Sequence, residues 1–124
     1  DELTIADTLL ENKIVLAMGI RHKAEEYMLH QINQFQGQIS WRVNRQNHSG
    51  TSSEFLAALA GMTNQTRELL NGYKQFGTAD SLAVLNEVSI MTPENIHLNS
   101  FMYEPLIDMD IVELLDLYIR IKSL

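Results

Sequence analysis

Residues 10–28 read LENKIVLAMGIRHKAEEYM, and their spacing is the strongest structural signal near the start of the chain. Positions at alternating steps of four and three residues lie along one face of an α-helix. Such steps connect Leu10, Ile14, Ala17, Arg21, Ala24 and Met28. Four more apolar residues widen this face: Leu9, Leu16, Ile20 and Tyr27. A face wider than a coiled-coil seam favours a helix packed in a bundle, and we predict one over residues 4–34.

The same spacing recurs in the middle of the chain and predicts a second long helix over residues 52–76. Its apolar face comprises Phe55, Leu59, Met62, Thr66, Leu69, Tyr73 and Phe76. Thr51 followed by Glu54 has the spacing of a capping box, in which each side chain accepts a hydrogen bond from an otherwise unpaired backbone N–H. We expect Gly77 to end this helix in a left-handed conformation. We expect Gly37 to close the first helix.

Two further principal helices complete the predicted bundle. The third helix is predicted over residues 80–91, with Asp80 or Ser81 as its cap. Its Leu82, Leu85 and Val88 are expected to face inward. Residues 109–123 follow a cap at Asp108 or Asp110, and their predicted buried positions are Ile111, Leu114, Leu115, Tyr118 and Ile121. A short helix is expected after Pro93, because proline suits the first helical position. Residues 99–109 are expected to connect it to the last helix while lying against the core.

The passage at residues 37–50 does not have helical spacing. Ile39, Trp41 and Val43 alternate there with polar residues, as in a strand. Because a single strand would have no partner, we expect an extended loop, with a small hairpin as the alternative. The predicted fold is therefore an all-α bundle of four principal helices, in which the first two form a long antiparallel pair.

Composition limits the classes of protein that the chain can belong to. The 124 residues are 45% hydrophobic and 20% charged, which is typical of one globular domain and excludes a disordered or collagen-like chain. Without cysteine there is no disulfide framework, thiol nucleophile or cysteine-bound zinc, and we expect a cytoplasmic protein. Because the chain begins at Asp1 without a methionine, we interpret residues 1–124 as a single domain of a larger protein. No apolar run is long enough to predict a membrane helix.

The net charge of −7 opposes bulk attraction to nucleic acid, so any such contact needs a local basic patch. The candidate patch comprises Trp41, Arg42, Arg45 and His48, just before the predicted start of the second helix. The arginines and the histidine could bind a phosphate or carboxylate beside the positive end of that helix. Trp41 could stack on a base. The alternative is a surface loop that its tryptophan anchors and whose arginines pair with the acidic C-terminal part of the chain.

Arg42 and His48 are separated by five residues, and this spacing resembles the active-site motif of the helical ribonucleases called HEPN domains. The resemblance covers seven residues and implies His48 as general base for a ribose hydroxyl and Arg42 as phosphate ligand. Two features depart from the family: Val43 follows Arg42 where a polar residue is common, and the flanking pattern is extended rather than helical.

A metal site is not predicted, although His22, Glu26 and His30 share one helical face. Eight residues of helix separate the two histidines by about 12 Å, too far for one ion with ligands at about 2 Å. Signatures for nucleotides, dinucleotides, serine hydrolases and zinc proteases are missing, so no cofactor is predicted. We therefore expect a non-catalytic interaction or oligomerisation module that binds a protein partner or itself. Nucleic-acid or phosphate recognition through the basic patch is the alternative.

Overall fold

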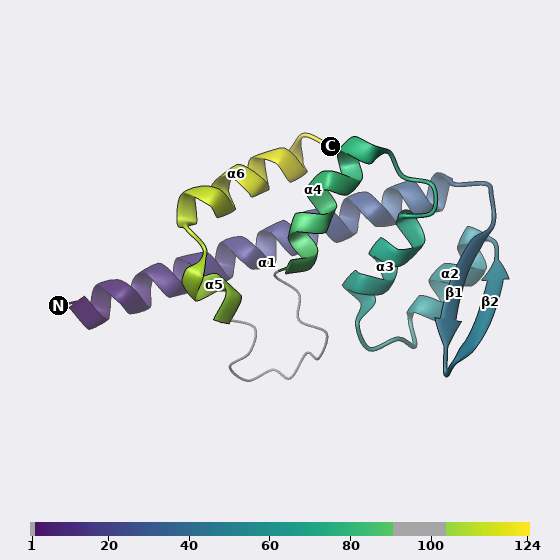
Figure 1. Ribbon diagram of the computed structural model, residues 1–124, viewed down its shortest axis with the longest axis horizontal. Helices are drawn as coiled ribbons and strands as arrows, with labels where there is room; N and C mark the ends of the chain where they lie inside the picture. The colour runs from purple at the N-terminus through teal and green to yellow at the C-terminus, as the bar shows by residue number, and fades with distance from the viewer. Residues whose placement is uncertain (1, 91–103) are drawn as a thin grey trace.

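The computed structural model describes residues 2–90 and 104–124, which are mostly helical and include one small antiparallel sheet. The elements follow in the order α1 (Glu2–Gln34), β1 (Ile39–Val43), β2 (Gln46–Gly50), α2 (Ser52–Leu59), α3 (Gln65–Tyr73), α4 (Ala79–Ile90), α5 (Glu104–Asp108) and α6 (Ile111–Lys122). Helix α1 is the longest described element, and α5 and α6 lie beside its N-terminal and middle parts (Figure 1). The sheet and α2 lie at its C-terminal end (Figure 1).

The core forms where α1 meets the shorter helices and β1. Steps of four residues separate Ile20, Ala24, Met28 and Ile32, which are buried on one side of α1. The other elements supply Ile39, Phe55, Leu59, Leu69, Leu70, Tyr73, Leu85, Val88, Leu106, Leu114, Leu117 and Ile121. The helical face predicted for residues 10–28 is therefore confirmed in its second half, and Leu85 and Val88 point inward as predicted.

The single helix predicted over residues 52–76 is wrong, because the chain breaks between Leu59 and Gln65. Gly61 and Met62 form turns there, with their N–H groups donating to Ala58 and Leu59. Asn64 then starts α3 by accepting a hydrogen bond from the N–H of Arg67 at 3.2 Å. The capping box at Thr51 and Glu54 is present and starts α2 as predicted. The long antiparallel pair does not form, and α1 packs against α6 and α3 instead.

The left-handed conformation predicted for Gly77 is also wrong. Among the described residues no glycine has a positive φ, so Gly77 does not end a helix in that way. Gly77 instead lies under the ring of Tyr73, where a Cβ would come within 2.5 Å of Cε1. The small size of this glycine is needed for close packing rather than for its backbone conformation.

The extended loop favoured for residues 37–50 is wrong, and the alternative of a small hairpin is correct. β1 pairs with β2 in antiparallel register, with Ile39 opposite Gly50 and Val43 opposite Gln46. Asn44 and Arg45 form the two-residue turn with φ values of 52° and 65°. Positive φ at both turn positions matches the right-handed twist of hairpin strands. The partner strand was not predicted because apolar and polar residues do not alternate in its sequence, QNHSG.

The C-terminal part differs from prediction in two ways. Asp110 caps α6, as one of the two predicted caps, but Leu117 is buried while Leu115 is exposed. The connection predicted over residues 99–109 contains the short helix α5, whose Leu106 is buried. The cap and short helix predicted at Pro93 lie outside the described residues.

Candidate functional site

The hairpin holds all four residues predicted to form a basic patch, and Trp41 has a packing role there. Its ring is half-buried and stacks on His48, with centroids 5.9 Å apart and an interplanar angle of 13°. It also contacts Phe55 of α2, with centroids 5.8 Å apart. These contacts attach the hairpin to the core, and the stacking of a base on the exposed part of Trp41 stays a prediction.

Arg42 and His48 lie on opposite faces of the hairpin. Side chains alternate along a strand, and the register pairs Trp41 with His48 and Arg42 with Asn47. The ring stacking of Trp41 and His48 confirms that these two share a face. A general base and a phosphate ligand must both reach the same scissile phosphate. Both residues nevertheless line one shallow hollow, so the ribonuclease roles that the HEPN resemblance implies stay a prediction.

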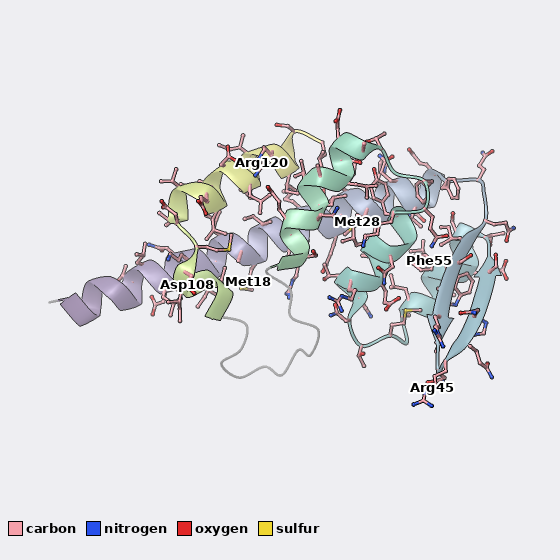
Figure 2. All side chains as sticks on the ribbon, viewed as in Figure 1. Met18, Met28, Arg45, Phe55, Asp108 and Arg120 are labelled. Carbon is pink, nitrogen blue, oxygen red and sulfur yellow. The ribbon has the colours of Figure 1, made fainter. Side chains whose placement is uncertain are left out.

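Arg42 and Arg45 are both exposed, and Arg45 extends from the tip of the hairpin (Figure 2). Neither guanidinium makes an ion pair with any residue that the structure describes. The sequence contains no aspartate or glutamate between Glu26 and Glu54, so this region is locally cationic in an acidic chain. One acidic residue lies in this region, because Glu68 of α3 lines the same shallow hollow as Arg42.

Gln75 closes the free edge of β1. Its Oε1 accepts a hydrogen bond from the N–H of Ser40 at 2.8 Å, and its Nε2 donates to the carbonyl of Ser40 at 2.7 Å. One amide side chain thus makes the two bonds that a neighbouring strand would make. Gln75 thereby ties the hairpin to the end of α3.

Helix α6 presents apolar side chains on two faces. Leu114, Leu117 and Ile121 are buried in the core. On the outer side, Val112, Leu115 and Ile119 are 65%, 46% and 61% exposed, and we call these three residues the α6 outer strip. Their spacing of three and four residues places them in one row along the helix. Because a surface helix normally exposes a polar face, this row is the most unusual surface of the described chain.

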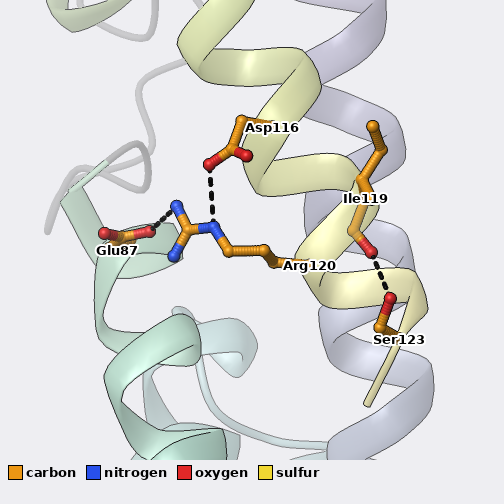
Figure 3. Close-up of polar contacts among 5 residues, drawn as sticks. All are labelled: Glu87, Asp116, Ile119, Arg120 and Ser123. Atoms are coloured by element: carbon orange, nitrogen blue, oxygen red, sulfur yellow. Dashed lines mark hydrogen bonds and ion pairs between the residues drawn. The ribbon is translucent and has the colours of Figure 1, made fainter.

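The polar residues of α6 gather on its side next to α4. Arg120 pairs with Glu87 of α4 and, at 2.9 Å, with Asp116 one turn earlier (Figure 3). The hydrogen bond with Glu87 is the main cause that raises the pKa of Arg120, so the guanidinium stays charged. Figure 3 shows Ile119 on the other side of α6 from Glu87. The buried residues Leu114, Leu117 and Ile121 set the orientation of α6, and the exposed ion pairs add a contact to α4.

Helix α1 extends the apolar surface beside α6. The two helices run side by side in the same direction (Figure 1), and the ring of Tyr118 lies over Gly19, at 3.6 Å from the position of a Cβ. One turn before Gly19 on α1, Val15 is 69% exposed. Met18 is also exposed on α1 (Figure 2).

Two features of the described residues concern a metal ion or a buried ligand. His22 lies 3.5 Å from Glu26 in an exposed pair on the surface of α1, and no described group of three ligands could hold an ion. The apolar cavity between Met28, Leu70 and Leu85 has room for about 10 Å³, roughly one water molecule. A small-molecule substrate does not fit there.

No family model, curated protein or solved structure matches this chain. Within residues 2–90 and 104–124, none of the helices is long and apolar enough to cross a bilayer. Function must therefore be argued from the two surfaces above. Sequence reasoning missed the α6 outer strip, although one signal was present: α6 has more apolar positions than one buried face can hold.

Proposed function

We propose that this chain is a non-catalytic helical interaction module, which binds a protein through the α6 outer strip. The observation that supports it is the row of Val112, Leu115 and Ile119, exposed on a helix whose other apolar face is already buried. Exposed apolar rows with polar neighbours are typical of protein interfaces. Covering each half-exposed side chain would contribute on the order of 1 kcal/mol. A cytoplasmic location is part of the proposal and rests on the cysteine-free sequence.

The strip suits a helical partner. An amphipathic helix binds through side chains spaced at three and four residues, which is the spacing of Val112, Leu115 and Ile119. The buried residues Leu114, Leu117 and Ile121 hold α6 in place before any partner binds. A surface that is already ordered loses little conformational entropy on binding.

Photo-crosslinking tests this function. A photoreactive amino acid replaces Ile119 in the chain expressed in cells, and Ala57, exposed on α2, receives it in the matched control. We expect a protein adduct, identified by mass spectrometry, at position 119 and not at 57. The adduct must disappear when Leu115→Asp is added. Equal adducts at both positions, or none at 119, would contradict the proposal.

A second candidate function is the binding of single-stranded nucleic acid or another polyanion by Arg42 and Arg45. The observation that favours it is that both arginines are exposed without an ion pair inside the described structure. Arginine also occupies a left-handed turn position at Arg45, where glycine would be favoured. Phosphate contacts of this kind carry no sequence information and weaken with salt.

Fluorescence anisotropy with labelled oligouridylate tests this second function. Replacing Arg42 and Arg45 together by alanine should weaken binding at least tenfold at low salt. Replacing Lys23 and Lys122 by alanine removes the same charge from the α1–α6 side and should change binding less than twofold. Equal losses of affinity in the two double variants would show that binding depends on the overall charge and not on Arg42 and Arg45.

A further inference from the structure

The outer edge of β2 presents backbone groups that are available for pairing. In an antiparallel pair, successive residues turn their N–H and C=O groups alternately toward the partner strand and away from it, and opposite residues do so together. Gln75 bonds both groups of Ser40, so Ser40 turns away from β2. Ser49, opposite Ser40, and Asn47, two residues earlier, therefore turn theirs away from β1. In the described part of the chain, neither residue has a backbone hydrogen-bond partner.

The described elements leave this edge of the sheet uncovered. Figure 1 shows β2 at the outer edge of the molecule, and Asn47, His48 and Ser49 are all exposed. Proteins commonly protect such edges with a proline, a lysine or a bulge. The strand QNHSG contains no proline or lysine, and its one-to-one register with β1 leaves no bulge. Gln75 closes the edge of β1, whereas β2 is able to accept a further strand.

The kinds of backbone group at this edge indicate what can bind there. An extended peptide offers both N–H and C=O groups, so it satisfies the donors and the acceptors of Asn47 and Ser49 together. Phosphate groups of a nucleic acid only accept hydrogen bonds and would leave both carbonyl oxygens unpaired. The edge therefore favours a peptide strand over a nucleic acid.

The charges beside β2 indicate that this peptide is acidic. Arg42 is opposite Asn47 and shares its face, and Arg45 lies in the turn where β2 begins. Glu68 lines the same hollow as Arg42 and compensates part of this charge, while the carboxylate of Glu54 is already bonded within the capping box. A second copy of β2 would bring arginines toward arginines, so pairing with itself is disfavoured.

We propose that β2 binds an extended acidic segment of another protein as a third, antiparallel strand of the sheet. This inference goes beyond the proposed function and uses a surface other than the α6 outer strip. Peptide residues opposite Asn47 and Ser49 exchange both backbone hydrogen bonds with them. Opposite side chains share a face, so these peptide residues lie on the face of Arg42, where acidic side chains are favoured. Two strand spacings, about 10 Å, separate the peptide from β1, which a long arginine and a glutamate side chain together can span.

Backbone methylation of a peptide tests the strand pairing. The probe is a fluorescein-labelled short peptide of alternating glutamate and valine, whose binding is measured by anisotropy. With the glutamates on the face of Arg42, N-methylation of the glutamates removes the N–H groups that face β2 and should weaken binding about tenfold or more. N-methylation of the valines removes N–H groups that face solvent and should change binding less than twofold. Equal effects of the two methylations would contradict strand addition.

Substitutions in the protein test the same edge. Ser49→Pro removes an outward N–H without removing a bond to β1, and it should weaken binding of the glutamate–valine peptide about fivefold. Ser49→Ala is the matched control, because it loses the same hydroxyl but keeps the N–H, and it should bind like the natural chain. Leu115→Asp, in the α6 outer strip, should also leave peptide binding unchanged. If Leu115→Asp abolishes binding, the peptide occupies the α6 outer strip and the inference is wrong.

Hydrogen exchange, read by NMR, tests the register in the natural chain. When the glutamate–valine peptide is bound, the amides of Asn47 and Ser49 should exchange about ten times more slowly. The amide of His48 faces β1 and should change less. No slowing at Asn47 and Ser49, or slowing at His48 alone, would contradict the proposed pairing. If oligouridylate and both methylated peptides bind as tightly as the unmodified peptide, the hairpin binds polyanions by charge alone and the inference is wrong.

Discussion

Two glycines show how much the effect of one methyl group depends on its surroundings. At Gly72 a Cβ would lie 2.6 Å from Cζ of Phe55, whose fully buried ring has no room to move. We expect Gly72→Ala to lower the free energy of unfolding by about 1–3 kcal/mol. At Gly19 a Cβ would lie 3.6 Å from Tyr118, an ordinary contact. Gly19→Ala should therefore raise the free energy of unfolding by up to about 1 kcal/mol. Urea unfolding measures both, and effects of the same sign would contradict the packing described.

Arg45 is the residue with the least favourable backbone conformation in the hairpin. Its φ of 65° costs a residue with a Cβ roughly 1 kcal/mol, a cost that glycine does not have. We expect Arg45→Gly to raise the free energy of unfolding by up to about 1 kcal/mol, measured by urea denaturation. Arg42→Gly is the control, because a strand position gains nothing from glycine. If polyanion binding is a function, Arg45→Gly should also weaken the binding of oligouridylate. That loss would explain why arginine is present at a strained position.

At the scale of elements, the hairpin depends on Gln75 as well as on its own strand pairing. Gln75→Ala removes both hydrogen bonds to the backbone of Ser40. We expect the amide of Ser40 to exchange with solvent about ten times faster, since each bond contributes about 1 kcal/mol. Asn71→Ala is the matched control, because Asn71 contacts Gln75 only through its backbone carbonyl, at 3.2 Å. Equal exchange rates for Ser40 in both variants, read by NMR, would show that this edge is held by other contacts.

The elements also show where sequence patterns were sufficient. The capping box at Thr51 and the cap at Asp110 are local hydrogen bonds, so residue type and spacing predicted them. The break between α2 and α3 was missed because Leu59, Met62 and Thr66 keep helical spacing across it. Gly61 and Asn64 were the available signal, since glycine weakens a helix and asparagine caps one.

At the scale of the whole molecule, a chain of hydroxyl groups joins three helices. Tyr27 of α1 lies 3.2 Å from Tyr73 of α3, which lies 2.8 Å from Ser81 of α4. Thr78 completes the chain by donating to Ser81 at 2.8 Å. Burial is the main cause that raises the pKa of Tyr27 above its ordinary value of 10.0, and the hydrogen bond with Tyr73 adds to it.

The raised pKa of Tyr27 predicts a loss of stability in alkali. Because the unfolded chain releases this proton first, its contribution is fully present below about pH 10 and decreases as the pH rises through the folded-state pKa. We expect the difference in unfolding free energy between the natural chain and Tyr27→Phe to be constant from pH 7 to 9 and to fall above pH 10. Urea unfolding across this range measures it. A difference that is flat up to pH 11.5 would contradict a shifted Tyr27.

Caps and periodicity are local properties of the chain. The amino-acid sequence was therefore sufficient to predict a mostly helical protein, the start of several helices and the side of α1 that enters the core. It also placed Trp41, Arg42, Arg45 and His48 in one segment. Contacts between distant parts of the chain established three further features: Trp41 packs on Phe55, Arg42 and His48 are on opposite faces of the hairpin, and QNHSG is a strand. They also decided which apolar face of α6 is buried. Helical spacing identifies apolar faces, but contacts between elements distant in sequence determine which of them remain exposed for a partner.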